Sequence, residues 1–122
     1  MKTALVIDDN RPFADGLCQM LTLLDIQAEP AYGSNHALWS LKTTAPDYVF
    51  LDINMPGLSG FEVLRFMHRE PKLTDVQVIV ITSDDQEETS NRALELGAHT
   101  VLIKPITLED LRKVIQPKKG RK

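Results

Sequence analysis

The chain has 122 residues, of which 43% are apolar and 25% are charged, and its net charge is −3. These values predict one globular domain with one core and argue against a disordered chain or a strongly basic nucleic-acid binder. No apolar run reaches the roughly 20 residues that a membrane-spanning helix needs. With a single cysteine, Cys18, and no visible signal peptide, we expect a reducing, cytoplasmic location.

Strand-like and helix-like segments alternate along the whole chain. In chain order we expect a strand at 5–7, a helix at 12–24, a weaker strand at 28–31, a helix from Ser34 that carries Leu38 and Leu41, a strand at 48–51, a helix that carries Phe61, Leu64 and Met67, a strand at 76–81, a helix at 87–96, a strand at 101–103 and a helix at 108–115.

Three residues mark expected helix ends. Pro12 suits the first turn of its helix, and Ser34 is a candidate N-cap for the next one. Gly97 follows the polar helix as a candidate C′ glycine.

A β-α alternation repeated five times predicts an α/β fold with a parallel sheet and helices on both faces. We expect this domain to cover residues 1–117, with a basic tail or linker stub at 118–122. In such sheets ligands bind beyond the carboxyl ends of the strands, so the residues directly after each strand are candidates for function.

Four of the five strands end in residues that carry chemistry. Asp8 and Asp9 follow the first strand, Asp52 the third, Thr82 the fourth and Lys104 the fifth. Three carboxylates about 4 Å apart would repel by about 4 kcal/mol per pair at an effective dielectric constant near 20. Some compensating charge is therefore expected at this edge of the sheet.

A divalent cation would supply that charge. Three carboxylates and one ammonium sum to −2, which Mg²⁺ brings to zero, and Mg²⁺ prefers a few carboxylates together with water and phosphate oxygens. A carboxylate held beside the metal stays ionised and can attack phosphorus to give an acyl phosphate. The metal and Lys104 would stabilise the charge on the transferred phosphoryl oxygens.

The pair Asp8-Asp9, the segment from Asp52 through Asn54-Met55-Pro56-Gly57 to Gly60, Thr82-Ser83 and Lys104-Pro105 together resemble the signature of response-regulator receiver domains of two-component systems. Each motif is weak alone, but four in register at successive strand ends are specific. The resemblance covers about residues 3–116. It implies a flavodoxin-like fold with strand order 2-1-3-4-5.

The resemblance also implies a role for each site residue. Asp52 matches the phosphoacceptor, and Asp8 and Asp9 match the acidic pair that binds Mg²⁺. Asn54 matches the residue whose backbone carbonyl also ligates the metal. Thr82 and Lys104 match the residues that contact the phosphoryl group, and the Lys104–Pro105 bond is expected to be cis.

The implied partners are a sensor histidine kinase or histidine phosphotransfer protein, which donates the phosphoryl group, and a downstream protein or effector domain. Neither nucleic acid nor membrane is an expected partner of this chain. One departure concerns the signal: Val101 stands where the family commonly has an aromatic switch residue. We therefore expect the loop and helix after Thr82 to carry the switch, and a partner face made of residues 83–101 and the last helix.

Three other functions are weaker interpretations. Phosphatases of the haloacid-dehalogenase type need a second acid two residues after the nucleophile, where this chain has Asn54. A receiver-like scaffold that is never phosphorylated would not need the full set of acids with Thr82 and Lys104. Nucleotide binding would need a glycine-rich loop after the first strand, where Asp8-Asp9 stand instead.

Overall fold

The computed structural model describes residues 1–57 and 59–115, and the expected basic tail at 118–122 lies outside them. The strands are β1 (Lys2–Ile7), β2 (Ile26–Ala31), β3 (Tyr48–Asp52), β4 (Gln77–Thr82) and β5 (Thr100–Ile103). The α-helices are α1 (Arg11–Leu23), α2 (Ser34–Thr43), α3 (Gly60–Arg69), α4 (Glu87–Glu95) and α5 (Leu108–Ile115), with a 3-10 turn at Pro71–Leu73.

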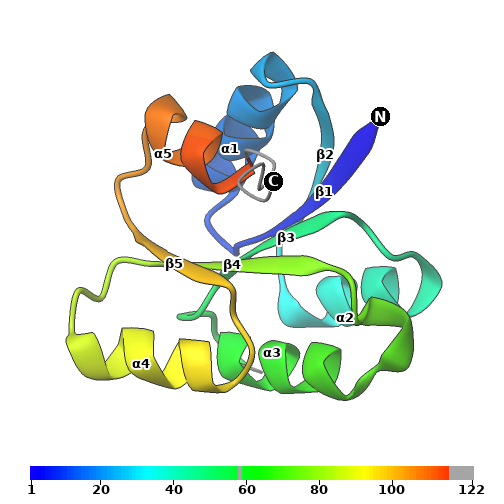
Figure 1. The fold of residues 1–122 in the computed structure, drawn as a ribbon, viewed down its shortest axis with the longest axis vertical. Coiled ribbons are helices and arrows are strands. Elements are labelled where there is room, and N and C mark those ends of the chain that lie inside the picture. Colours follow the sequence, from blue (N-terminus) through cyan, green and yellow to red (C-terminus); the bar gives the residue numbers. More distant parts are fainter. Residues whose placement is uncertain (58, 116–122) are drawn as a thin grey trace, which may run out of the picture.

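The five strands form one parallel sheet in the order β2-β1-β3-β4-β5 (Figure 1). The predicted α/β fold and its strand order are therefore confirmed. Strand order reverses between β1 and β3, which are neighbours in the sheet although β2 separates them in sequence. This is the switch point at which ligands bind in doubly wound sheets.

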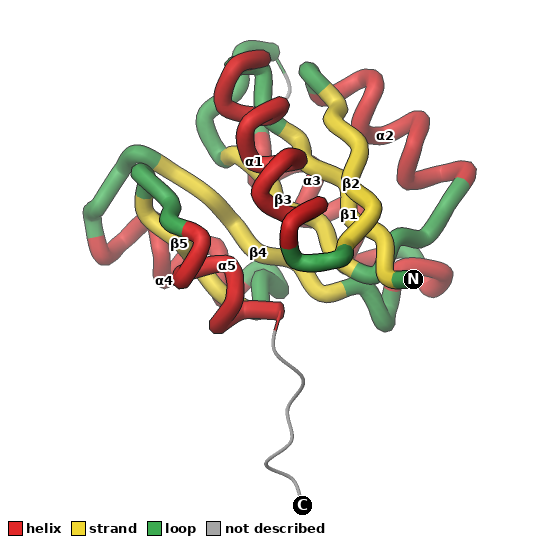
Figure 2. Tube along the Cα trace, turned by 90° about the horizontal axis from the view of Figure 1, so that it is seen from above, coloured by secondary structure: helices red, strands yellow, loops and turns green. Residues whose placement is uncertain are grey.

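Helices cover both faces of the sheet. α1 and α5 lie on one face, and α2, α3 and α4 lie on the other (Figure 1). Seen from above, α2 lies near the β2 edge, whereas α4 and α5 lie near the β5 edge (Figure 2). The central strands contribute alternate residues to the two apolar layers, as the period of two along a strand requires.

The position of β3 in the core explains why this strand could be predicted most clearly from the sequence. All five residues of β3 are buried, because the strand has neighbours on both sides and helices on both faces. The edge strand β2 is less apolar, and its Pro30 is tolerated because an edge strand leaves some backbone N–H groups unpaired.

The predicted helix ends had mixed outcomes. Pro12 lies in the first turn of α1, and Gly97 follows α4 with a φ of +112°, so both predictions are confirmed. Ser34 as a cap was wrong: Gly33 is the N-cap, and no side chain caps α2. Ser34 is the first helical residue, and it is buried.

Within the part of the chain that the structure describes, no helix has the length and apolar character required to cross a bilayer.

Candidate phosphoacceptor and metal site

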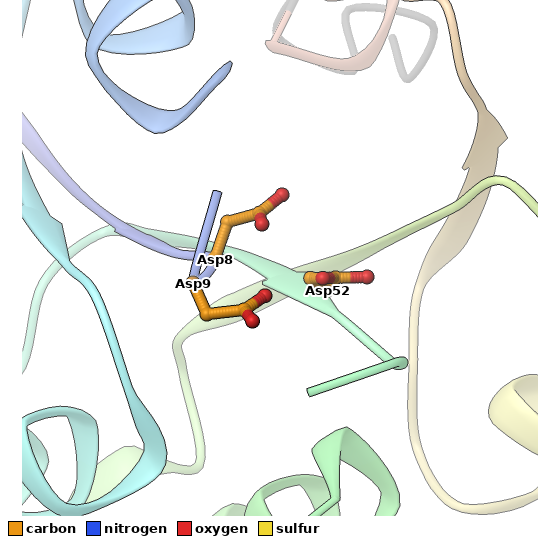
Figure 3. Close-up of side chains that lie close together, drawn as sticks. All are labelled: Asp8, Asp9 and Asp52. Atoms are coloured by element: carbon orange, nitrogen blue, oxygen red, sulfur yellow. The ribbon is translucent and has the colours of Figure 1, made fainter. Parts of the chain in front are cut away.

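Three carboxylates meet at the carboxyl ends of β1 and β3. Asp8 and Asp9 follow β1 directly, and Asp52 is the last residue of β3. One carboxylate oxygen from each lies within 4.8 Å of the others, and the side chains of Asp8 and Asp9 point toward the end of β3 (Figure 3). The register that pairs Ile7 with Leu51 sets the two acidic ends side by side.

Burial differs sharply among these acids. Asp8 is fully buried and Asp52 is 4% exposed, whereas Asp9 is exposed. Burial, and next the charge of Asp8, raise the pKa of the Asp52 carboxyl from 3.8 to about 7. The backbone N–H of Asn54 donates to Asp52 Oδ1 at 3.1 Å and opposes this shift, as does the charge of Lys104.

Helix capping does not account for the two acids after β1. The N-cap of α1 is Asn10, whose side-chain oxygen accepts a hydrogen bond from Phe13 N–H at 3.1 Å. Asp8 Oδ1 accepts the backbone N–H of Asn10 at 2.9 Å, which fixes the Asp8 carboxylate at the strand end. Asp8 and Asp9 are therefore free of the capping role.

Lys104 reaches the site from the end of β5. Its Nζ lies 3.0 Å from Asp8 Oδ2, and its side chain is 19% exposed, so it is not a solvated surface lysine. The ammonium also lies 4.1 Å from the centroid of the Phe13 ring. The Lys104–Pro105 peptide bond is cis, as the resemblance implied.

Thr82 links the acids to the loop after β4. It is fully buried, and its hydroxyl oxygen accepts the Asp84 backbone N–H at 3.0 Å and the Asn54 side-chain amide at 3.4 Å. Both bonds use the oxygen as acceptor, so the hydroxyl proton of Thr82 remains available to a further acceptor.

A second set of bonds continues from Asp84 into α4. The Asp84 carboxylate accepts the Thr89 hydroxyl at 2.6 Å and the Gln86 backbone N–H at 2.8 Å, and these bonds hold the pKa of Asp84 below its usual value. Sequence reasoning missed Thr89 and Phe13. A signal existed for each: Thr89 lies in the first turn of a helix that follows an acid-rich loop, and Phe13 in the first turn after the acidic pair.

The donor set fits a hard divalent cation. Two of the three carboxylates are buried, and within the described residues the one lysine bonded to the cluster contacts Asp8 rather than Asp52. The cluster thus keeps excess negative charge in a region of low solvent exposure, which a small dication bound by oxygen atoms would neutralise. No group of histidine or cysteine ligands lies nearby among the described residues.

The family model for the response regulator receiver domain matches residues 4–116. The chain belongs to the response-regulator receiver family. Receiver domains are regulatory signalling domains that bind a divalent metal at an acidic pocket. The family assignment argues against the dehalogenase-type phosphatase and the nucleotide-binding interpretations.

Curated relatives match this chain over different shares of their own length. Protein PilH of Pseudomonas aeruginosa is 31% identical over 115 residues, which cover 94% of this chain and 95% of PilH. The phosphate regulon transcriptional regulatory protein PhoB of Escherichia coli is 31% identical over 107 residues, covering 88% of this chain and 47% of PhoB. The chain thus spans about half the length of the PhoB relatives that it matches.

Solved receiver structures superpose closely on this one. The signal receiver domain of a DNA-binding response regulator from Colwellia psychrerythraea has a TM-score of 0.88 and 32% identity, covering 94% of this chain and 95% of that one. A response regulator from Burkholderia pseudomallei has a TM-score of 0.87 and 25% identity, covering 95% and 67%. That Burkholderia structure contains a phosphorylated aspartic acid and a calcium ion.

Proposed function

We propose that this receiver domain accepts a phosphoryl group on Asp52 from a phosphohistidine of a sensor histidine kinase or histidine phosphotransfer protein. The observation that carries the proposal is the buried Asp52 carboxylate, grouped with Asp8 and Asp9 within 4.8 Å at the switch point of the sheet. An acid in this position is costly for folding and valuable for chemistry.

Transfer of the phosphoryl group from the phosphohistidine to Asp52 forms one P–O bond and breaks one P–N bond. A carboxylate oxygen of Asp52 attacks phosphorus, the P–N bond of the phosphohistidine breaks, and the imidazole leaves with the bonding electron pair and takes up a proton. Lys104 Nζ, now 3.0 Å from Asp8, is within reach of the phosphoryl oxygens at the same strand ends. The free hydroxyl proton of Thr82 can donate to the product phosphate.

The residues that would hold Mg²⁺ are Asp8, Asp9, Asp52 and the backbone carbonyl of Asn54. When bound, Mg²⁺ supplies positive charge to the phosphoryl oxygens and keeps the carboxylates ionised. Asp8 and Asp52 provide fixed oxygen atoms from two neighbouring strands. Asp9 would provide an exposed carboxylate at the edge of the same cluster.

The domain acts as a regulatory phosphoacceptor, not as an enzyme that turns over a separate substrate. The same residues promote phosphorylation and the later attack of water on phosphorus, which releases inorganic phosphate and restores the Asp52 carboxylate. We place this exchange in the cytoplasm. We assign the receiver to residues 1–117 and residues 118–122 to a tail or linker.

The signal leaves the site through Thr82 and the segment that follows it. If Thr82 turns its hydroxyl to the phosphate, the hydrogen bond from the Asp84 backbone N–H to the Thr82 hydroxyl oxygen is distorted. The carboxylate of Asp84 in turn accepts a hydrogen bond from Thr89 of α4, so the change can reach that helix. Helix α4 buries only Ala93, so it is held by few apolar contacts and can shift between two arrangements.

The partner face consists of residues 83–101 and α5. Leu94 on α4 is an exposed apolar side chain of this face, with 46% of its surface exposed; Ile103, two residues beyond residue 101, is 38% exposed. A downstream protein or an effector domain would bind here. Backbone NMR with and without beryllofluoride, a phosphoryl mimic, should show large shifts from Thr82 to about Ala93; shifts confined to the acids and Lys104 would refute this route.

The proposed phosphorylation is tested by incubating the protein with acetyl phosphate and analysing its intact mass. We expect the added mass of one phosphoryl group in the presence of Mg²⁺ and none in EDTA. Asp52→Asn, which preserves the shape and the hydrogen bond from Asn54 N–H, should remain unmodified. Equal modification of parent and variant would contradict the assignment.

A further inference from the structure

The ammonium of Lys104 has two neighbours in the resting site. One is Asp8 Oδ2 at 3.0 Å, and the other is the ring of Phe13, whose centroid is 4.1 Å from Nζ. Phe13 lies in the first turn of α1, and its backbone N–H is bound by the N-cap Asn10. The ring is therefore fixed to the same loop that carries Asp8 and Asp9.

The first of these contacts weakens when a divalent cation binds. A cation bound to the Asp8 carboxylate neutralises its charge and repels the ammonium beside it. Lysine has a long flexible stem and a strongly hydrated head, so an ammonium released from Asp8 would tend to move into solvent. The face of an aromatic ring, which attracts cations through its quadrupole, opposes that movement without carrying any charge that the metal could neutralise.

We propose that Phe13 is a positioning residue for Lys104: its ring keeps the ammonium at the mouth of the acidic site when the cation takes over Asp8. The Lys104 ammonium is then already at the site when the phosphoryl group arrives and does not first have to return from solvent. The inference rests on the proposed phosphorylation of Asp52, and it adds a residue that acts through Lys104 and does not touch the phosphoryl group.

The surroundings of Phe13 allow its ring to be tested apart from its bulk. Phe13 lines an apolar groove of about 490 Å³ between α1 and the segment after β5, together with Leu17, Met20 and Ile106. Leucine in place of Phe13 would keep an apolar wall but would remove the aromatic face. Tyrosine would keep the face, since Phe13 is only partly buried.

The contact itself is tested by NMR of the Lys104 side chain in EDTA and in Mg²⁺. Ring currents should shift the ε-methylene protons of Lys104 upfield in the parent protein, and this shift should disappear in Phe13→Leu and return in Phe13→Tyr. The inference requires the upfield shift to persist in Mg²⁺. An ε-methylene signal that moves to its solvent value when Mg²⁺ binds the parent would overturn it.

The consequence is tested by the rate of phosphorylation with acetyl phosphate, a small-molecule donor that has no protein surface to pack against the groove. At saturating Mg²⁺, Phe13→Leu should lower the rate roughly two- to tenfold, the range expected for one cation–π contact. Phe13→Tyr should restore it. Tyr32→Leu is the control: it removes a different aromatic ring, whose centroid lies 4.2 Å from Arg11 Cζ, and it should leave the rate unchanged.

A double-mutant cycle separates positioning from a general effect on the fold. In a Lys104→Met background, Phe13→Leu should cause no further loss of rate. An equal loss in both backgrounds, or no loss in the parent background, would refute the role of Phe13. A parent protein that takes up no phosphoryl group would instead refute the proposed function, while the NMR result would still decide whether the ring holds the ammonium in Mg²⁺.

Discussion

Removing the Asp52 carboxylate should stabilise the metal-free protein in a way that depends on pH. Asp52 is 4% exposed and lies beside the fully buried Asp8, and burial together with this neighbouring charge raises its pKa from 3.8 to about 7. A carboxyl whose pKa is raised by folding contributes its full stability below about pH 4. That contribution is lost as the pH rises toward 7, because the folded state must then hold the ionised form.

The size of the effect follows from the shift in pKa. One unit corresponds to about 1.4 kcal/mol, so a rise from 3.8 to about 7 corresponds to about 4 kcal/mol at complete ionisation. Relaxation of the site and entry of water reduce this figure. We expect Asp52→Asn to raise the free energy of unfolding by on the order of 2–4 kcal/mol at pH 8 in EDTA, and by much less at pH 4.

Urea denaturation in EDTA at several pH values measures this difference, and Mg²⁺ provides the control. Added Mg²⁺ at pH 8 should stabilise the parent more than the variant, because the variant has lost one ligand. A stability difference between parent and Asp52→Asn that is the same at pH 4 and pH 8 would refute the electrostatic reasoning. So would a variant that is less stable than the parent at pH 8 in EDTA.

Three further substitutions, together with one control, test other parts of the domain. Asp9→Asn should weaken Mg²⁺ binding measured by calorimetry, and should raise the melting temperature in EDTA by less than Asp52→Asn does, because Asp9 is exposed; a lower melting temperature would mean that Asp9 mainly stabilises the fold. Gly60→Ala should cost about 1–3 kcal/mol in urea denaturation, since its Cβ would lie 2.4 Å from the backbone oxygen of Asp52. Gly16→Ala, a matched helical control with open space around its Cβ, should be neutral or stabilising by up to about 1 kcal/mol. Asn54→Ala removes the amide bonded to the Thr82 hydroxyl and should alter the dephosphorylation rate, which an acid-labile phosphate assay would measure.

The fold could be predicted because its strands and its helices differ in the spacing of their apolar residues. The buried central strand is apolar from Tyr48 to Leu51, and the last helix begins at Leu108, the residue at which it was predicted to begin. The exact residue at which a helix begins was harder to predict. Ser34 has the chemistry of a cap, but the chain enters α2 one residue earlier, so Gly33 takes the N-cap position and Ser34 is buried as the first helical residue.

The convergence of the acids could be predicted from the rule that parallel strands end at one edge. The contacts that Lys104, Asp84 and Thr89 make could not be predicted in the same way. Charge alone does not show that Lys104 contacts Asp8 instead of Asp52, or that Phe13 lies under the ammonium. Spacing alone does not show that Asp84 is bonded to Thr89, because both bonds depend on how loop and helix pack.

The central claim is that Asp52 is the phosphorylated residue, and reductive trapping tests it most directly. Borohydride reduces an aspartyl phosphate to homoserine, which peptide mass spectrometry can locate in the sequence. After treatment with acetyl phosphate and Mg²⁺, we expect homoserine at position 52 alone, and none when Mg²⁺ is replaced by EDTA. Homoserine at Asp8, at Asp9 or at any other acid, with position 52 unchanged, would contradict the account.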